Sequence, residues 1–73
     1  MNKINEYPEV GKRVEIYFKN TEKNIEGHHD GIWDGKEWKF REPYTVDKYE
    51  PIPAHITPLG WCELPDSRAP YAK

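Results

Sequence analysis

Apolar and polar residues alternate most regularly between Arg13 and Lys19. Val14, Ile16 and Phe18 fall at every second position, and the residues between them are mostly polar. Successive side chains of a β-strand point to opposite faces of a sheet, so this period of two predicts a strand with one buried face. The β-branched and aromatic members of the run favour the same interpretation.

Two further strands are predicted at Ile25–Trp33 and Glu37–Arg41, on either side of Asp34-Gly35. Asp-Gly between two runs that contain apolar residues is typical of a β-hairpin, because a tight turn needs a positive φ that glycine adopts without strain. Gly27 and Gly31 lie within the earlier strand, which indicates a bulge, a bend or room for a large neighbour.

The register of this hairpin has two solutions. A two-residue loop at Asp34-Gly35 pairs Trp33 with Lys36 and places Trp33, Trp38 and Phe40 on one face. A three-residue loop that begins at Trp33 instead puts Ile32 on the face of Trp38 and Phe40, and leaves Trp33 in the turn. We favour the two-residue loop because it clusters the aromatic residues.

The remaining chain is less regular. Asn20–Asn24 is polar and predicts a hairpin loop. Glu42–Pro53 contains three prolines and predicts a loop, and one short helix within 42–53 is also compatible with its sequence. Ala54–Leu64 is expected to form a closing strand, and Pro58 indicates that this strand lies at an edge or starts only at Leu59. Residues 1–65 would form a single domain and 66–73 a flexible C-terminal tail.

These elements predict an all-β fold: a small, twisted antiparallel sheet or partly open barrel of four to five strands. Its expected core consists of Val14, Ile16, Phe18, Trp38, Phe40, Trp61 and Leu64. The chain has 73 residues, and 36% of them are hydrophobic. Ten aromatic side chains compensate for the few aliphatic ones, since each removes roughly 150–250 Å² from water when buried.

Charge, cysteine content and hydropathy exclude several classes of protein. The formal net charge is −2 and no basic run exceeds Lys12-Arg13, which argues against duplex binding driven by counterion release. One cysteine, Cys62, excludes an internal disulfide. No apolar run approaches the ~20 residues of a membrane span and the N-terminus lacks a signal-peptide core. We expect a cytoplasmic protein.

Short motifs near both ends resemble an uncharacterised family of small phage and prophage domains. Pro8-Glu9-x-Gly11-x-x-Val14 precedes the first long strand, Asp34-Gly35-Lys36-Glu37-Trp38 lies mid-chain, and Trp61-x-x-Leu64-Pro65 closes the domain. The resemblance covers Tyr7 to Pro65, although Tyr7 stands where the family tends to have leucine and Ile4 stands where it often has tryptophan. It implies a phage or mobile-element origin and a β-rich fold, and it implies no activity.

No catalytic or metal site is predicted, and no cofactor. His28 and His29 are adjacent in a strand and point to opposite faces, and His55 and Cys62 lack the paired short spacing of a zinc site. Cys62 with His55 as a thiol–imidazole pair would need a third orienting group. The carboxylate pairs Asp30 with Asp34 and Glu37 with Glu42 are better explained by a turn and by solubility than by acid–base catalysis.

Two binding hypotheses remain, and neither makes the protein an enzyme. In the first, exposed aromatic side chains dock on a host or phage protein, with inhibition of a host defence system as one form; the candidates are Tyr44, Tyr49, Tyr71 and Trp33. In the second, a single-stranded nucleic acid stacks on the central hairpin; the candidates are Trp33, Lys36, Trp38, Lys39 and Arg41. An open strand edge would allow a monomer or a weak homodimer.

Overall fold

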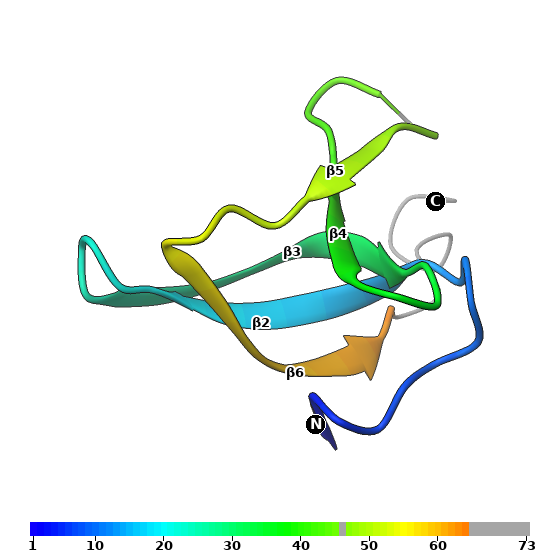
Figure 1. The fold of residues 1–73 in the computed structure, drawn as a ribbon, viewed down its shortest axis with the longest axis horizontal. Helices are drawn as coiled ribbons and strands as arrows, with labels where there is room; N and C mark the ends of the chain where they lie inside the picture. Colours follow the sequence, from blue (N-terminus) through cyan, green and yellow to red (C-terminus); the bar gives the residue numbers. More distant parts are fainter. Residues whose placement is uncertain (46, 65–73) are drawn as a thin grey trace, which may run out of the picture.

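All the strands belong to one antiparallel sheet (Figure 1). The computed structural model describes residues 1–45 and 47–64. The strands are β1 (Asn2–Lys3), β2 (Val14–Asn20), β3 (Ile25–Trp33), β4 (Trp38–Arg41), β5 (Tyr49–Pro51) and β6 (Ile56–Glu63). Their order across the sheet is β1-β6-β2-β3-β4-β5, so the sheet is open at β1 and at β5. The predicted all-β class is confirmed.

The sheet has six strands, against the four to five expected, because two short edge strands were not predicted. β1 pairs with the end of β6 at Trp61 and Gly60. β5 pairs with β4 and occupies part of the 42–53 segment for which a short helix was considered; among the described residues no helix forms. The proposed tail at 66–73 lies outside the described residues.

The hairpin between β3 and β4 differs from both predicted registers. Trp33 pairs with Trp38, Ile32 with Lys39 and Gly31 with Phe40, so residues 34–37 form a four-residue loop. The favoured two-residue loop was too short by two residues, Lys36 and Glu37, both on the β4 side of the turn. A register shift of two preserves which face each side chain takes, so Trp33, Trp38 and Phe40 do share a face.

The core lies on one face of the sheet. Val14 and Ile16 are fully buried, and Trp38 and Trp61 are 9% and 7% exposed. Of the expected core, Phe18, Phe40 and Leu64 are only partly buried. Phe40 packs against the edge of the cluster together with Ile4, Trp33 and Ile52. The core is therefore smaller than predicted, because within residues 1–45 and 47–64 no second layer covers the outer part of this face.

The N-terminal segment takes the place of a second layer. Figure 1 shows it running from β1 beneath the end of β6 and back up to β2, while β4 and β5 rise steeply from the plane of β2 and β6. The indole N–H of Trp61 donates a hydrogen bond to the carbonyl oxygen of Glu6. Pro8 is buried, and Gly11 donates its N–H to the carbonyl of Trp33 at 2.9 Å. These contacts hold the segment against the core.

Pro58 lies inside β6, which begins at Ile56, two residues beyond the start predicted from the sequence at Ala54. It faces Phe18, next to a register shift between Tyr17 and Phe18. Among the described strands, β1 reaches only the end of β6, so the other side of the strand at Pro58 has no partner. This position suits proline, which has no N–H to donate.

Gly31 is a packing constraint in the middle of the sheet, and it provides a test. A Cβ at this position would collide with the carbonyl oxygen of Lys39 and with Cδ1 of Ile16. Overpacking of this kind costs about 1–3 kcal/mol, so Gly31→Ala should lower the free energy of unfolding in urea by that amount. At Gly27, a Cβ would lie 2.9 Å from Cζ of Phe18, a ring edge that can shift, so Gly27→Ala should cost clearly less. Equal effects would contradict the packing.

Candidate functional site: an aromatic groove

Three aromatic rings from distant parts of the chain meet beside the β3–β4 turn. Tyr7 stacks on Trp33 with a ring-centroid distance of 4.1 Å and an interplanar angle of 21°. Trp33 in turn contacts Trp38 across the hairpin at 5.4 Å. Trp38 is nearly buried, whereas Tyr7 is 55% exposed and Trp33 is half-buried. The three rings thus run from the core to the surface.

The turn that presents Trp33 is fixed by Asp34. One carboxylate oxygen of Asp34 accepts the backbone N–H of Lys36 at 2.8 Å and of Glu37 at 2.7 Å. The other oxygen lies 3.1 Å from Nζ of Lys39. The bonds from Glu37 and Lys36, with a smaller contribution from Lys39, lower the pKa of Asp34 to about 2. The aspartate is therefore a turn residue that positions the tryptophan pair.

These rings form one wall of a groove with a volume of about 490 Å³. A second wall comes from the N-terminal segment at Ile4 and Asn5. The third comes from the connection between β5 and β6 and from the start of β6, at Ile52, Pro53, Ala54, Ile56 and Pro58. Lys36 and Glu37, of opposite charge, also line it. The groove is hereafter called the aromatic groove. It is lined mainly by aromatic, proline and aliphatic side chains, which suits apolar groups of a ligand.

The structure separates the three described residues among the four proposed for protein binding. Trp33 lines the aromatic groove. Tyr49 lies on edge strand β5 opposite Arg41, and Tyr44 is fully exposed in the loop between β4 and β5. Tyr71 lies outside the described residues. These aromatic candidates therefore lie on two separate surfaces: Trp33 beside the turn between β3 and β4, and Tyr44 and Tyr49 at the loop between β4 and β5.

Tyr44 adopts a backbone conformation that is unusual for its residue type. Its φ is +66°, and the N–H of Thr45 donates to the carbonyl of Glu42 at 3.4 Å. This is a turn with Pro43 second and Tyr44 third, where a positive φ normally selects glycine or asparagine. The side chain of Tyr44 is fully exposed, so no buried contact compensates for this backbone strain.

The nucleic-acid candidates do not form one platform. Lys36 and Trp33 line the aromatic groove, but Trp38 is 9% exposed. Lys39 and Arg41 alternate with Trp38 and Phe40 along β4, so they point to the opposite face of the sheet. There, Lys39 is paired with Asp34 and Arg41 with Asp30. Both cations are thus held by carboxylates of the same chain.

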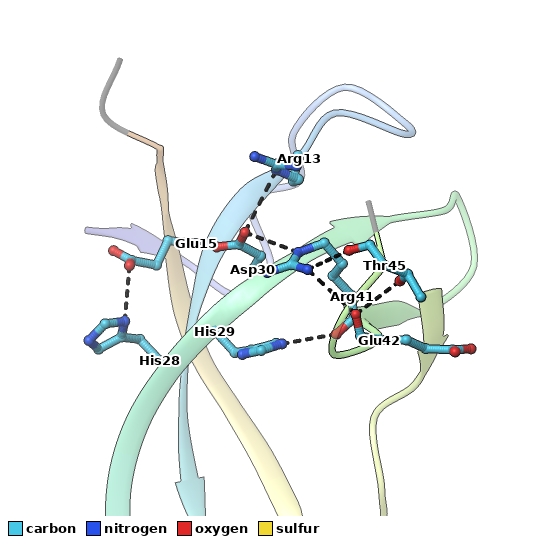
Figure 2. A network of polar contacts seen from close by, with 8 residues as sticks. All are labelled: Arg13, Glu15, His28, His29, Asp30, Arg41, Glu42 and Thr45. Carbon is cyan, nitrogen blue, oxygen red and sulfur yellow. Dashed lines mark hydrogen bonds and ion pairs between the residues drawn. The ribbon is translucent and has the colours of Figure 1, made fainter. Parts of the chain in front are cut away.

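Figure 2 shows the network around Arg41. Its Nε lies 3.3 Å from a carboxylate oxygen of Asp30, and its Nη1 donates to the carbonyl of Thr45 at 2.6 Å. Arg13 approaches the same oxygen of Asp30 at 3.8 Å. On the other side of the strand, Nε2 of His29 donates to the carbonyl of Arg41 at 2.9 Å. The network ties the loop after β4 to β3.

His55 and Cys62 are not brought together. His55 precedes β6 and Cys62 lies near its end, and at about 3.3 Å per residue the strand separates them by about 20 Å. Cys62 faces Glu15 instead. Glu15 accepts the hydroxyl hydrogen of Tyr17 at 2.9 Å and lies 2.9 Å from Nδ1 of His28. The bond to Glu15 raises the pKa of Tyr17, and Cys62 adds to that effect.

The other polar candidates have structural roles. Within residues 1–45 and 47–64, no three His, Cys, Asp or Glu side chains gather to hold a metal ion. Asp30 serves the arginine network and Asp34 the turn. Glu37 is exposed beside the groove and Glu42 holds Thr45 through its carbonyl, at 2.9 Å from Oγ1. In the same part of the chain, no helix is long and apolar enough to cross a membrane.

Tyr7 was not among the residues predicted to form a site. Its partner Trp33 lies 26 positions later, and no periodicity links the two. Only the path of the N-terminal segment across the sheet brings their rings into contact.

In comparisons with known proteins, no family model, curated protein or solved structure matches this chain. The resemblance to small phage domains therefore rests on the sequence motifs alone.

The lowered pKa of Asp34 gives a testable pH dependence. Because its pKa falls from the ordinary 3.8 to about 2 on folding, the ionised carboxylate stabilises the fold above about pH 4, and this stabilisation is lost as the pH falls from 4 through 2. Asp34→Asn keeps an acceptor for the turn but carries no charge. We expect the difference in unfolding free energy between wild type and Asp34→Asn to shrink between pH 5 and pH 2. A constant difference would contradict the assignment.

The strained turn at Tyr44 gives a second test. Glycine pays no steric penalty at positive φ, and the ring of Tyr44 buries nothing. We therefore expect Tyr44→Gly to leave stability unchanged or to raise it by up to about 1 kcal/mol. Tyr49→Gly, on β5, should lower it. Urea unfolding of both variants measures this, and a marked loss of stability in Tyr44→Gly would show that the side chain packs against the protein.

Proposed function

We propose that the protein is a small, non-catalytic binding module whose aromatic groove receives an extended segment of a partner protein. The observation that carries the proposal is the Tyr7–Trp33 stack at the surface end of the groove. Stacked rings with an exposed edge beside a cavity of about 490 Å³ supply rigid apolar contact area at a low cost in side-chain entropy. Tyrosine and tryptophan are also the side chains most often found at interface hot spots.

The character of the groove supports a protein partner over a nucleic acid. Pro53, Pro58 and Ile52 line it opposite the rings, and such walls favour aliphatic or proline side chains. The two charges at the groove, Lys36 and Glu37, cancel. A nucleic-acid strand would require a positive path for its phosphates beside the rings, and two of the basic candidates, Lys39 and Arg41, are paired with carboxylates on the opposite face.

The sequence motifs shared with small phage domains direct the search for that partner. On this proposal the protein acts in the host cytoplasm by docking on a host or phage protein, and inhibition of a host defence protein is one form such docking takes. No residue of the groove performs chemistry in this account. Its effect on the partner comes from occupying a surface.

The test is affinity capture from cell lysate with tagged wild type, read by mass spectrometry with and without nuclease. We expect one abundant protein that survives nuclease treatment and whose affinity falls more than about tenfold for Tyr7→Ala and Trp33→Ala, as for interface hot spots. Tyr44→Ala removes a ring that lies outside the groove and is more exposed than Tyr7 or Trp33, and it serves as the control. Loss of binding in Tyr44→Ala alone would place the contact on the β4–β5 loop and contradict the proposal.

A titration with an oligothymidine, followed by tryptophan fluorescence, distinguishes the proposed protein binding from binding of a single-stranded nucleic acid. The proposal expects no salt-dependent binding. Salt-dependent quenching that disappears in Trp33→Ala, together with captured proteins that vanish with nuclease, would support a single-stranded nucleic-acid binder instead.

A further inference from the structure

β3 extends beyond its pairing with β4. β2 pairs with β3 from Ile25 to Gly31, but β4 pairs only with residues from Gly31 to Trp33. Over Ile25–Asp30, therefore, none of the described strands pairs with the side of β3 that faces away from β2. Figure 1 shows this part of β3 leaving β4 and running out with β2 to the tip of the hairpin.

The backbone hydrogen bonds of the turn fix which residues face this open side. The N–H of Asp34 donates to the carbonyl of Glu37 at 3.1 Å, so the backbone of Asp34 points toward β4. Peptide groups of an antiparallel strand alternate between its two neighbours. The carbonyl of Trp33 accordingly points the other way, where it accepts the N–H of Gly11. Glu26 and His28 lie an even number of residues before Asp34. Their N–H and C=O groups therefore point to the same side as those of Asp34, which over this stretch is the open side.

This edge lacks the protection that the other edges have. Edge strand β5 contains Pro51, and the unpartnered part of β6 contains Pro58. Proline and lysine are the common means of preventing strand addition, and the stretch Ile25–Asp30 contains neither. Ile25 is 55% exposed and the side chain of His28 is 61% exposed. Arg41 contacts Asp30 and His29 at one end of this stretch, so the part most open to a further strand is Ile25–His28.

The charges along this edge select a second copy as the occupant. Pairing of outward-facing residues in an antiparallel pair of β3 strands permits two-fold axes at each position from Ile25 to His29. An axis at Ile25 or at His29 pairs fewer residues of the stretch Ile25–Asp30 than an axis at Gly27, which leaves Glu26, Gly27 and His28 to compare. An axis at Glu26 sets Glu26 against itself, and one at His28 sets Glu26 against Asp30, which like charges disfavour. An axis at Gly27 sets Glu26 of each copy opposite His28 of the other. It also brings together two glycines, which have no side chains to clash.

We infer that a second copy of this chain adds to the free edge of β3, antiparallel and centred on Gly27, so that the two sheets become one. The exposed Ile25 of each copy then lies opposite His29 of the other, on the face where the ring of Phe18 covers Gly27. This contact uses the outer end of the hairpin and leaves the aromatic groove free for a partner.

Sedimentation velocity over a range of concentrations tests the inference. Wild type should show a monomer–dimer equilibrium. Glu26→Pro removes an N–H that points to the open side, so it should abolish the dimer while the circular dichroism and melting temperature stay close to those of wild type. Ile25→Pro removes an N–H that points to β2 and should destabilise the fold. If Glu26→Pro destabilises the fold as much as Ile25→Pro does, the assigned hydrogen-bond phase is wrong and the inference fails.

A charge reversal tests the register. Glu26→Lys faces His28 of the second copy at two symmetric places and should weaken the dimer about tenfold. Glu22→Lys makes the same change of charge in the turn between β2 and β3, outside the paired stretch, and should leave the dissociation constant unchanged. Monomer at every concentration, a dimer that persists in Glu26→Pro, or equal effects of the two lysine variants would overturn the inference.

Discussion

A single sheet has no second layer to cover its apolar face, and the rest of this structure follows from that constraint. The sheet twists until β4 and β5 stand steeply against β2 and β6 (Figure 1), and the N-terminal segment closes over what remains. Val14 and Ile16 are fully buried by this arrangement, with Trp38 and Trp61 beside them. With so few buried side chains, each close contact matters, and Gly31 is where the sheet has the least room.

The aromatic groove is a consequence of the same incomplete coverage. The hydrogen bonds to Asp34 set a four-residue turn, and this turn makes Trp33 and Trp38 direct neighbours across the hairpin. Trp38 then serves the core, while Trp33 extends beyond it and stacks on Tyr7. Between these rings and the β5–β6 connection, the open sheet leaves a space that a closed barrel would fill with its own strand. The aromatic groove thus lies where the sheet remains open.

The long strands and the all-β class could be predicted from the sequence, because Val14, Ile16 and Phe18 keep a period of two and Asp34-Gly35 marks the turn. The loop length could not, since a shift of two residues leaves every side chain on the same face and the hydrophobic pattern is equally satisfied. β1 and β5 are too short to produce a pattern. Tyr7 could not be predicted as a site residue, because its contact with Trp33 depends on the path of the N-terminal segment. The ion pairs of Lys39 and Arg41 could not be predicted either, because they depend on neighbours across the sheet.

The central claim is that the partner contacts the protein at the aromatic groove. Site-specific photo-crosslinking in cells tests it most directly, with benzoylphenylalanine placed at Tyr7 in one variant and at Tyr44 in another. Both positions are tyrosines, so the substitutions are matched in size, and Tyr44 is the more exposed of the two, at 104% against 55% for Tyr7. The account predicts a defined protein adduct from position 7 and none from position 44. An adduct from position 44 alone would contradict it.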